Sequence, residues 1–146
     1  MFYRNFIVGL CFLFATSLAV ASDSERHQVV GASSVYLGVI PVQLVKEHPG
    51  MHGVKTPRGQ SYHILVALFD RTSGKRITDA KVKATVSFPG TKKVTKELEP
   101  MRGDLISYGN YFMMQEPGVY RIRIEIERKE GGGTSVANFR FQRPSD

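Results

Sequence analysis

The spacing of apolar residues is the feature of this sequence that most constrains its fold. From about residue 34 onward apolar side chains recur at every second position, and no segment shows the 3.6-residue period of an amphipathic helix. The clearest case is residues 120–126, where Tyr or Ile alternates with Arg or Glu. Because successive side chains of a strand point to opposite faces, this alternation predicts strands with one buried face. We therefore predict an all-β domain.

Clusters of turn-forming residues divide this pattern into about seven short strands. Residues 61–70 are apolar on both faces, which predicts a central strand, whereas Pro41 predicts an edge strand with a bulge. The number and spacing of the strands predict an immunoglobulin-like two-sheet sandwich over residues 34–143, preceded by a flexible lead at 22–33. The expected turns lie at residues 71–74, 89–90, 116–118 and 131–133.

The N-terminus has the three parts of a cleaved export signal. Arg4 is the only charge before Asp23, an apolar run begins at Phe6, and residues 19–21 read Ala-Val-Ala. The strongly apolar run is shorter than the roughly 20 residues that a transmembrane helix needs. We therefore expect residues 1–21 to be a signal peptide rather than an anchor, with no stable membrane span after cleavage. The mature protein is expected to be periplasmic or secreted.

Cysteine usage limits the chemistry of the mature domain. Cys11 is the only cysteine and lies within the predicted signal peptide. The mature domain would therefore have neither disulfides nor thiolate ligands. Any metal site would have to use His, Met, Asp or Glu side chains.

The chain is basic, with a formal net charge of +7. A membrane surface, a nucleic acid or an acidic protein would each attract such a charge. Lys and Arg alternate with Val and Ile, however, so a solvated strand face explains most of the excess, and the expected export argues against nucleic acid. The basic residues cluster at Lys92, Lys93, Lys96, Arg121, Arg123, Arg128 and Lys129.

No catalytic motif is present in the sequence. The chain has no GxSxG, Walker, HExxH or GxGxxG pattern. Ser61 and His63 would share one face of a strand, but nothing else in the sequence supports a nucleophile and base at this place. We therefore predict that the protein is not an enzyme.

The segment His48-Pro-Gly-Met51-His52-Gly is the strongest candidate for a ligand site. Methionine normally fills a hydrophobic core, so a methionine between two histidines in a Gly/Pro loop suggests a soft metal ligand. Thioether and imidazole together suit copper in both of its oxidation states. The alternative is a surface loop that carries scattered histidines, and the sequence leaves this open.

His63 and Met101 are weaker candidates for the same site. His63 lies near the start of the central strand and Met101 lies in a loop after Pro100, so each could complete a copper site if the loops meet. A satisfied, partly buried histidine is the alternative for His63. His27 lies in the expected flexible lead and is predicted to be a bystander.

Two further segments could belong either to the core or to a binding face. Met113 and Met114 are adjacent on a strand and must point to opposite faces, with core packing favoured. Residues 108–112 combine aromatic side chains with a glycine inside a strand, which indicates a bulge or a close backbone approach. We interpret this run as aromatic core, with a partner-binding face as the alternative.

Two runs carry a resemblance to a known family. The sequence YHILVALFDRTSGKRITDAKVKATV, followed by PGVYRIRIEI, resembles small periplasmic immunoglobulin-like domains of the YtkA and FixH type over about residues 60–127. Within it, the position of Tyr120 after a tight turn is similar to a tyrosine corner. CopC-type copper carriers are a looser analogy. The resemblance implies an accessory role in envelope metal handling or oxidase assembly, and it assigns no ligands.

The sequence thus leads to two hypotheses. The first is a periplasmic, non-catalytic copper carrier or accessory protein with His48, Met51 and His52 as main ligands. The second is a metal-free sandwich that binds another envelope protein, such as an oxidase-assembly factor, through an edge strand or the aromatic residues at 108–112.

Overall fold

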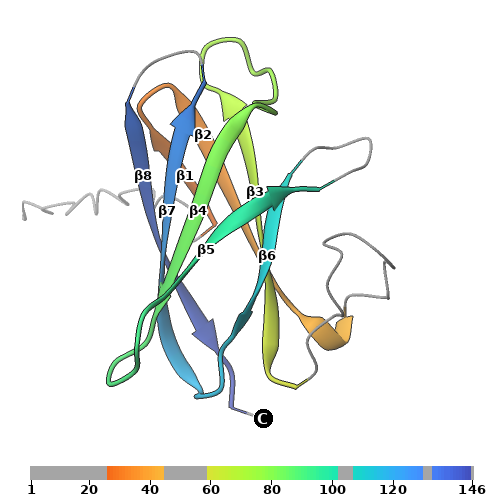
Figure 1. Cartoon of the computed structure of the whole chain (residues 1–146), viewed down its shortest axis with the longest axis vertical. Helices are drawn as coiled ribbons and strands as arrows, with labels where there is room; N and C mark the ends of the chain where they lie inside the picture. The colour runs from red at the N-terminus through yellow and green to blue at the C-terminus, as the bar shows by residue number, and fades with distance from the viewer. Residues whose placement is uncertain (1–25, 45–58, 102–106, 130–132, 146) are drawn as a thin grey trace, which may run out of the picture.

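The computed structural model describes residues 26–44, 59–101, 107–129 and 133–145, and most of these lie in β-strands (Figure 1). The predicted signal peptide lies outside the described residues. The strands are β1 (His27–Val30), β2 (Ser33–Pro41), β3 (Ser61–Asp70), β4 (Ala80–Ser87), β5 (Val94–Pro100), β6 (Tyr108–Met113), β7 (Gly118–Arg128) and β8 (Thr134–Arg143), with a short 3-10 helix, η1 (Val42–Leu44).

The eight strands form one antiparallel sheet in the order β1-β2-β3-β6-β5-β4-β7-β8. The prediction of an all-β domain is confirmed, but the expected two separate sheets are joined through β5. This strand pairs with β4 along most of its length and then with β6 at Glu99 and Pro100. A period of two reveals which face of a strand is buried, but not whether the strand has partners on both sides.

The two edges of the sheet come close to each other. The side chain of Gln28 in β1 donates to the carbonyl of Asn138 in β8 at 2.5 Å and accepts from its N–H at 3.0 Å. The sheet is therefore nearly closed. Strand β1 lies within residues 22–33, which the sequence predicted to be a flexible lead. The strand has only four residues with partial apolar alternation, and a segment this short was not recognised as a strand from the sequence.

The inner face of the curled sheet holds the hydrophobic core. In β7, Tyr120, Ile122, Ile124 and Ile126 are at most 4% exposed, whereas the Arg residues between them are exposed. The prediction that residues 61–70 form a central strand is also confirmed, because β3 pairs with β2 on one side and β6 on the other. The most deeply buried large side chains include Ile64, Leu68, Leu98, Tyr108, Phe112 and Met114.

Two buried tyrosine hydroxyls tie the ends of strands together. The Tyr120 hydroxyl donates to the carbonyl of Glu116 at 2.9 Å and accepts from its N–H at 3.1 Å, as expected for a tyrosine corner. The Tyr108 hydroxyl accepts from the Ala80 N–H at 3.0 Å and donates to the Ile77 carbonyl. Burial raises the pKa of both phenols, so both hydroxyls keep their protons at neutral pH.

Within the part of the chain that the structure describes, no helix is long and apolar enough to cross a membrane.

Candidate metal site

His63 lies on the outer face of the central strand β3 and is nevertheless only 2% exposed. The register of β3 with β6 places it opposite Tyr111. The two rings stack with their centroids 4.5 Å apart and an interplanar angle of 24°. This stacking and burial hold the plane of the imidazole in place, so His63 is a positioned side chain rather than a mobile surface one.

Met101 follows directly after β5 and is held by Ser107 at both its backbone and its side chain. The Met101 N–H donates to the Ser107 carbonyl at 2.7 Å, and the Ser107 hydroxyl donates to the Met101 sulfur at 3.7 Å. Strand β5 pairs with β6 at this point, since Glu99 lies opposite Gly109. These contacts bring the thioether above the start of β6.

Gly109 is the residue that allows His63 and Met101 to meet. A Cβ atom built on Gly109 would lie 2.7 Å from Nε2 of His63 and 2.8 Å from Sδ of Met101. Both donor atoms therefore converge on the space that a side chain would otherwise fill. The sequence carried a signal for this arrangement, because a glycine inside a strand often marks the close approach of another group.

The two donors suit a soft metal ion. Imidazole and thioether are a ligand pair that copper accepts, and ligand bonds to first-row metals such as zinc are roughly 2.0–2.3 Å long. The two atoms lie within 2.8 Å of one point beside the Gly109 backbone, so an ion bound by both would have to lie farther from the backbone than this point, and the two side chains would have to shift toward it. A third wall of this space is apolar, since Leu65 Cδ2 lies 3.1 Å from the same point.

The other predicted ligands are not placed by the structure. His48, Met51 and His52 lie outside the described residues. Among those that the structure does describe, no group of three or more His, Cys, Asp or Glu side chains could hold a metal ion. Of the five predicted ligands, the described part of the chain brings together two, His63 and Met101.

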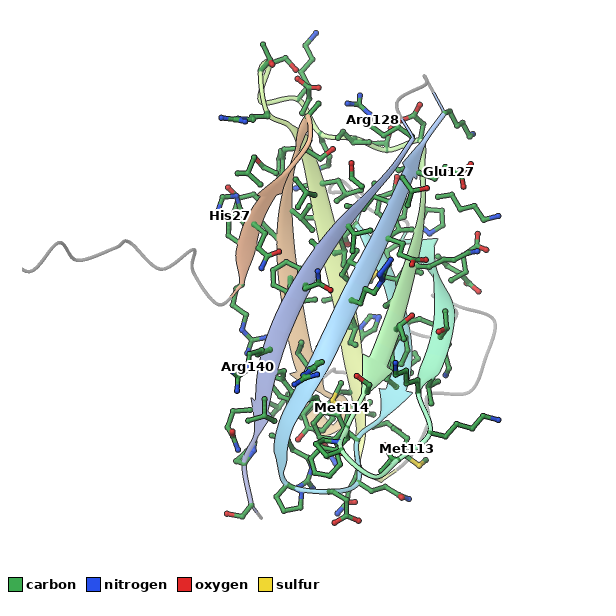
Figure 2. All side chains as sticks on the ribbon, turned by 90° about the vertical axis from the view of Figure 1, so that its left-hand side faces the viewer. His27, Met113, Met114, Glu127, Arg128 and Arg140 are labelled. Carbon is green, nitrogen blue, oxygen red and sulfur yellow. The ribbon has the colours of Figure 1, made fainter. Side chains whose placement is uncertain are left out.

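The remaining histidine and methionines have other surroundings (Figure 2). His27 lies in β1 and stacks on Tyr36, with ring centroids 4.3 Å apart. Met114 is completely buried and Met113 is 58% exposed, which confirms that they point to opposite faces. Core packing, predicted for both methionines, is wrong for Met113.

The aromatic run at 108–112 belongs mainly to the core. Tyr108 and Phe112 are each 1% exposed, and Tyr111 stacks on His63. The interpretation of this run as aromatic core is confirmed for these two side chains. They are accordingly unable to form the exposed partner-binding face that was the alternative.

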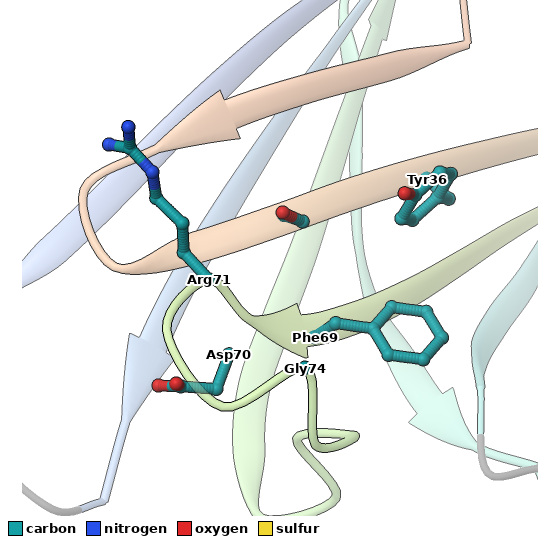
Figure 3. Close-up of a pocket in the computed structure, with 6 residues that line it drawn as sticks. Tyr36, Phe69, Asp70, Arg71 and Gly74 are labelled. Atoms are coloured by element: carbon teal, nitrogen blue, oxygen red, sulfur yellow. The ribbon is translucent and has the colours of Figure 1, made fainter.

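A cavity of about 440 Å³ lies on the same outer face, where β3 ends (Figure 3). The Asp70 carboxylate in its wall accepts hydrogen bonds from Thr72, Ser73 and Arg128. Ser73 above all lowers the pKa of Asp70 to about 2, so this carboxylate stabilises the turn and is already satisfied. The lining residues are Ser34, Tyr36, Phe69, Asp70, Arg71 and Gly74.

Comparisons with known proteins support the fold. No protein-family model matches the chain, and no curated protein matches it. Among solved structures, a copper-bound variant of FetP from uropathogenic Escherichia coli strain F11 is similar, with 13% identity, a TM-score of 0.66 and coverage of 81% of this chain and 93% of the other. FetP from the same strain, as isolated after expression in the periplasm, gives 14% identity, a TM-score of 0.66 and coverage of 82% and 93%.

A third solved structure is a DUF4426 family protein from Pseudomonas aeruginosa PAO1. It shares 17% identity and a TM-score of 0.68, with coverage of 83% of this chain and 96% of that one. At these identities the likeness establishes a common small β-fold. A specific relationship to YtkA or FixH domains stays a prediction.

Proposed function

We propose that the protein is a non-catalytic copper-binding accessory or carrier protein that works outside the cytoplasm. The observation that carries this proposal is the convergence of the His63 imidazole and the Met101 thioether on the space above Gly109. Copper is favoured over harder ions because a thioether binds soft cations. A site built from thiolate ligands is excluded because the mature domain would have no cysteine.

Two further points support the proposal. The copper-bound FetP variant shows that a protein of similar fold can hold this metal. The signal peptide predicted at residues 1–21 would deliver the protein to the periplasm or beyond, where FetP was also expressed. We propose that His48, Met51 and His52 supply the remaining ligands.

The first test compares two methionines of the purified protein. Met101→Leu keeps the size of the side chain but removes the thioether, so we expect Cu(I) affinity to fall at least tenfold, as measured by competition with a chromophoric chelator. Met113→Leu is the matched control, because Met113 is 58% exposed and contributes nothing to the site. Equal Cu(I) affinities for the Met101→Leu variant and the unmodified protein would contradict the proposal.

A second test concerns the loop ligands. Cu(I) and Cu(II) are titrated into the His48→Ala/His52→Ala double variant and into the unmodified protein. We expect weaker uptake by the double variant, above all for Cu(II), because imidazole is the preferred ligand of that ion. Equal uptake by both proteins would remove the loop from the site while leaving His63 and Met101 to be judged by the first test.

The second candidate function is a metal-free interaction module for another envelope protein. It is favoured by two exposed side chains on the outer face of the sheet, Val29 in β1 and Tyr36 in β2, which are 41% and 46% exposed. The register pairs Tyr36 with His27 and Val29 with Ser34, so the two side chains are diagonal neighbours on one face. Exposed apolar side chains that share a face can form a partner-binding surface. This function predicts that the protein binds no copper but is captured by its partner through a surface that Tyr36→Ser would disrupt.

A further inference from the structure

The outer face of β4, β7 and β8 has two halves that differ in charge pairing. In the half near the end of β7, Lys81 lies opposite Glu127 and Lys83 lies opposite Glu125. Cross-strand neighbours of opposite charge stabilise a sheet. This half is therefore electrically balanced and is explained by folding alone.

In the other half of the face, two arginines lie opposite each other. The register of β7 with β8 pairs Arg121 with Arg140, and on its other side Arg121 faces the uncharged Ser87. Both arginines are exposed, and Figure 2 shows Arg140 projecting outward from β8, far from Glu127. The nearby Arg123 is already paired with Glu125 at 2.8 Å.

This arrangement is unfavourable for folding unless an anion is present. Like charges directly opposite each other destabilise a sheet, and over the described residues neither Arg121 nor Arg140 forms an ion pair with a carboxylate. Each guanidinium group has parallel N–H donors that match the oxygens of phosphate. An anionic oxygen group between them would convert the repulsion into two attractions.

The positive charge continues beyond the two arginines. The hairpin that follows Ser87 carries Lys92 and Lys93, both exposed. Phe88 at the start of this hairpin packs against Tyr120, the neighbour of Arg121, with ring centroids 4.7 Å apart. The hairpin and the arginine pair therefore lie at the same end of the molecule.

We propose that this basic end binds phosphate groups at the surface of an anionic phospholipid membrane. A membrane is favoured over a single soluble phosphate because the cations are spread over β7, β8 and a hairpin. Lipid headgroups are also laterally mobile and can adjust to the positions of the two arginines, which the pairing of β7 with β8 places opposite each other. Each basic residue near such a surface strengthens binding to it.

The test measures co-sedimentation of the purified protein with vesicles containing 30% phosphatidylglycerol in phosphatidylcholine. We expect Arg121→Gln/Arg140→Gln to lose most of the bound fraction. The matched control is Lys81→Gln/Lys83→Gln, which removes the same charge from the balanced half and should keep most of the binding. Because the arginine variant relieves a repulsion, its melting temperature should equal or exceed that of the unmodified protein.

Four results would overturn the proposal. They are equal loss of binding in the two variants, no binding by the unmodified protein, complete displacement from vesicles by 10 mM inorganic phosphate, and arginine-dependent binding to polyglutamate without binding to vesicles. The third would indicate a soluble oxyanion and the fourth an acidic protein. Arg140→Gln alone repeats the test if the double variant fails to fold, with an intermediate loss of binding expected.

Discussion

The two outer faces of the curled sheet obey the same alternation and yet differ in chemistry. The outer positions of β1, β2, β3 and β6 are almost without charge, and they include Tyr36, Leu65, Phe69 and His63. Half of the outer positions of β4, β7 and β8 are Lys, Arg or Glu, such as Lys81 and Arg121. Folding requires only the inner face to be apolar, so it explains the charged face but not the uncharged one.

The proposed copper site lies on the uncharged face. The uncharged face carries the buried imidazole of His63, the thioether of Met101 and the glycine that makes room for both. Low local polarity strengthens the binding of a soft ion by excluding water. On the charged face, only the unbalanced end at Arg121 and Arg140 is unexplained by folding.

The largest effect is expected from filling the space above Gly109. Gly109→Ala places a Cβ atom 2.7 Å from His63 Nε2, so we expect a loss of about 1–3 kcal/mol of stability and of most copper binding. Gly38→Ala is the matched control on the same face, because its nearest neighbour, Leu65 Cβ, is 3.4 Å away. Urea unfolding and copper titration check both, and an undisturbed Gly109→Ala protein would refute the site geometry.

Tyr108 connects the strands that carry the two faces, because it lies in β6 and its hydroxyl accepts a hydrogen bond from Ala80 at the start of β4. Tyr108→Phe leaves the Ala80 N–H without its acceptor, so we expect a loss of about 1–3 kcal/mol of stability. Tyr62→Phe serves as the control, since Tyr62 is also buried but its ring packs on Phe141 without a comparable hydrogen bond in the described structure. Similar urea midpoints for the two variants would show that the hydroxyl of Tyr108 contributes nothing.

Gln28 joins the faces at the edge of the sheet. Gln28→Ala removes both hydrogen bonds to Asn138, and we expect a loss of about 0.5–1.5 kcal/mol and faster hydrogen exchange of the β1 amides. Gln142→Ala, in the exposed part of β8, should leave exchange in β1 unchanged. Unaltered exchange in the Gln28 variant would mean that the sheet edges hold together without this side chain.

The smallest effect concerns pH. Asp70 has a folded pKa of about 2, below its usual 3.8, so its stabilising contribution is complete above the usual value and is lost as the pH falls through 2. Asp70→Asn should flatten the dependence of stability on pH in this range, as measured by urea unfolding. Arg128→Gln should flatten it less, because Ser73 is the larger cause of the shift.

The period of the apolar residues predicted the class of fold and most strand positions. It located β3 at residues 61–70 and the inner face of β7, because both depend only on local alternation. It missed β1, because the pairing of this strand with β2, such as His27 opposite Tyr36, becomes apparent only after β2 is placed. It also missed the double role of β5, because pairing at Glu99 depends on how far the sheet curls.

The candidate site was predicted as residue types but not as an arrangement. His63 and Met101 were named because imidazole and thioether bind copper, but their convergence depends on β5 and β6 pairing at Gly109. Arg121 and Arg140 were harder to recognise. Arg121 was seen as one member of a basic cluster, and its repulsive neighbour follows only from the register of β7 and β8.

The order of strands in the sheet has a consequence for how the protein matures. Strands β4 and β5, or β7 and β8, are neighbours along the chain and can pair early as hairpins, whereas β3 must wait for β6. Pairings between distant segments form slowly because a long loop must close first. His63 and Met101 therefore come together at a late step, and under the proposed function a newly made chain would gain its metal affinity only once folding is complete.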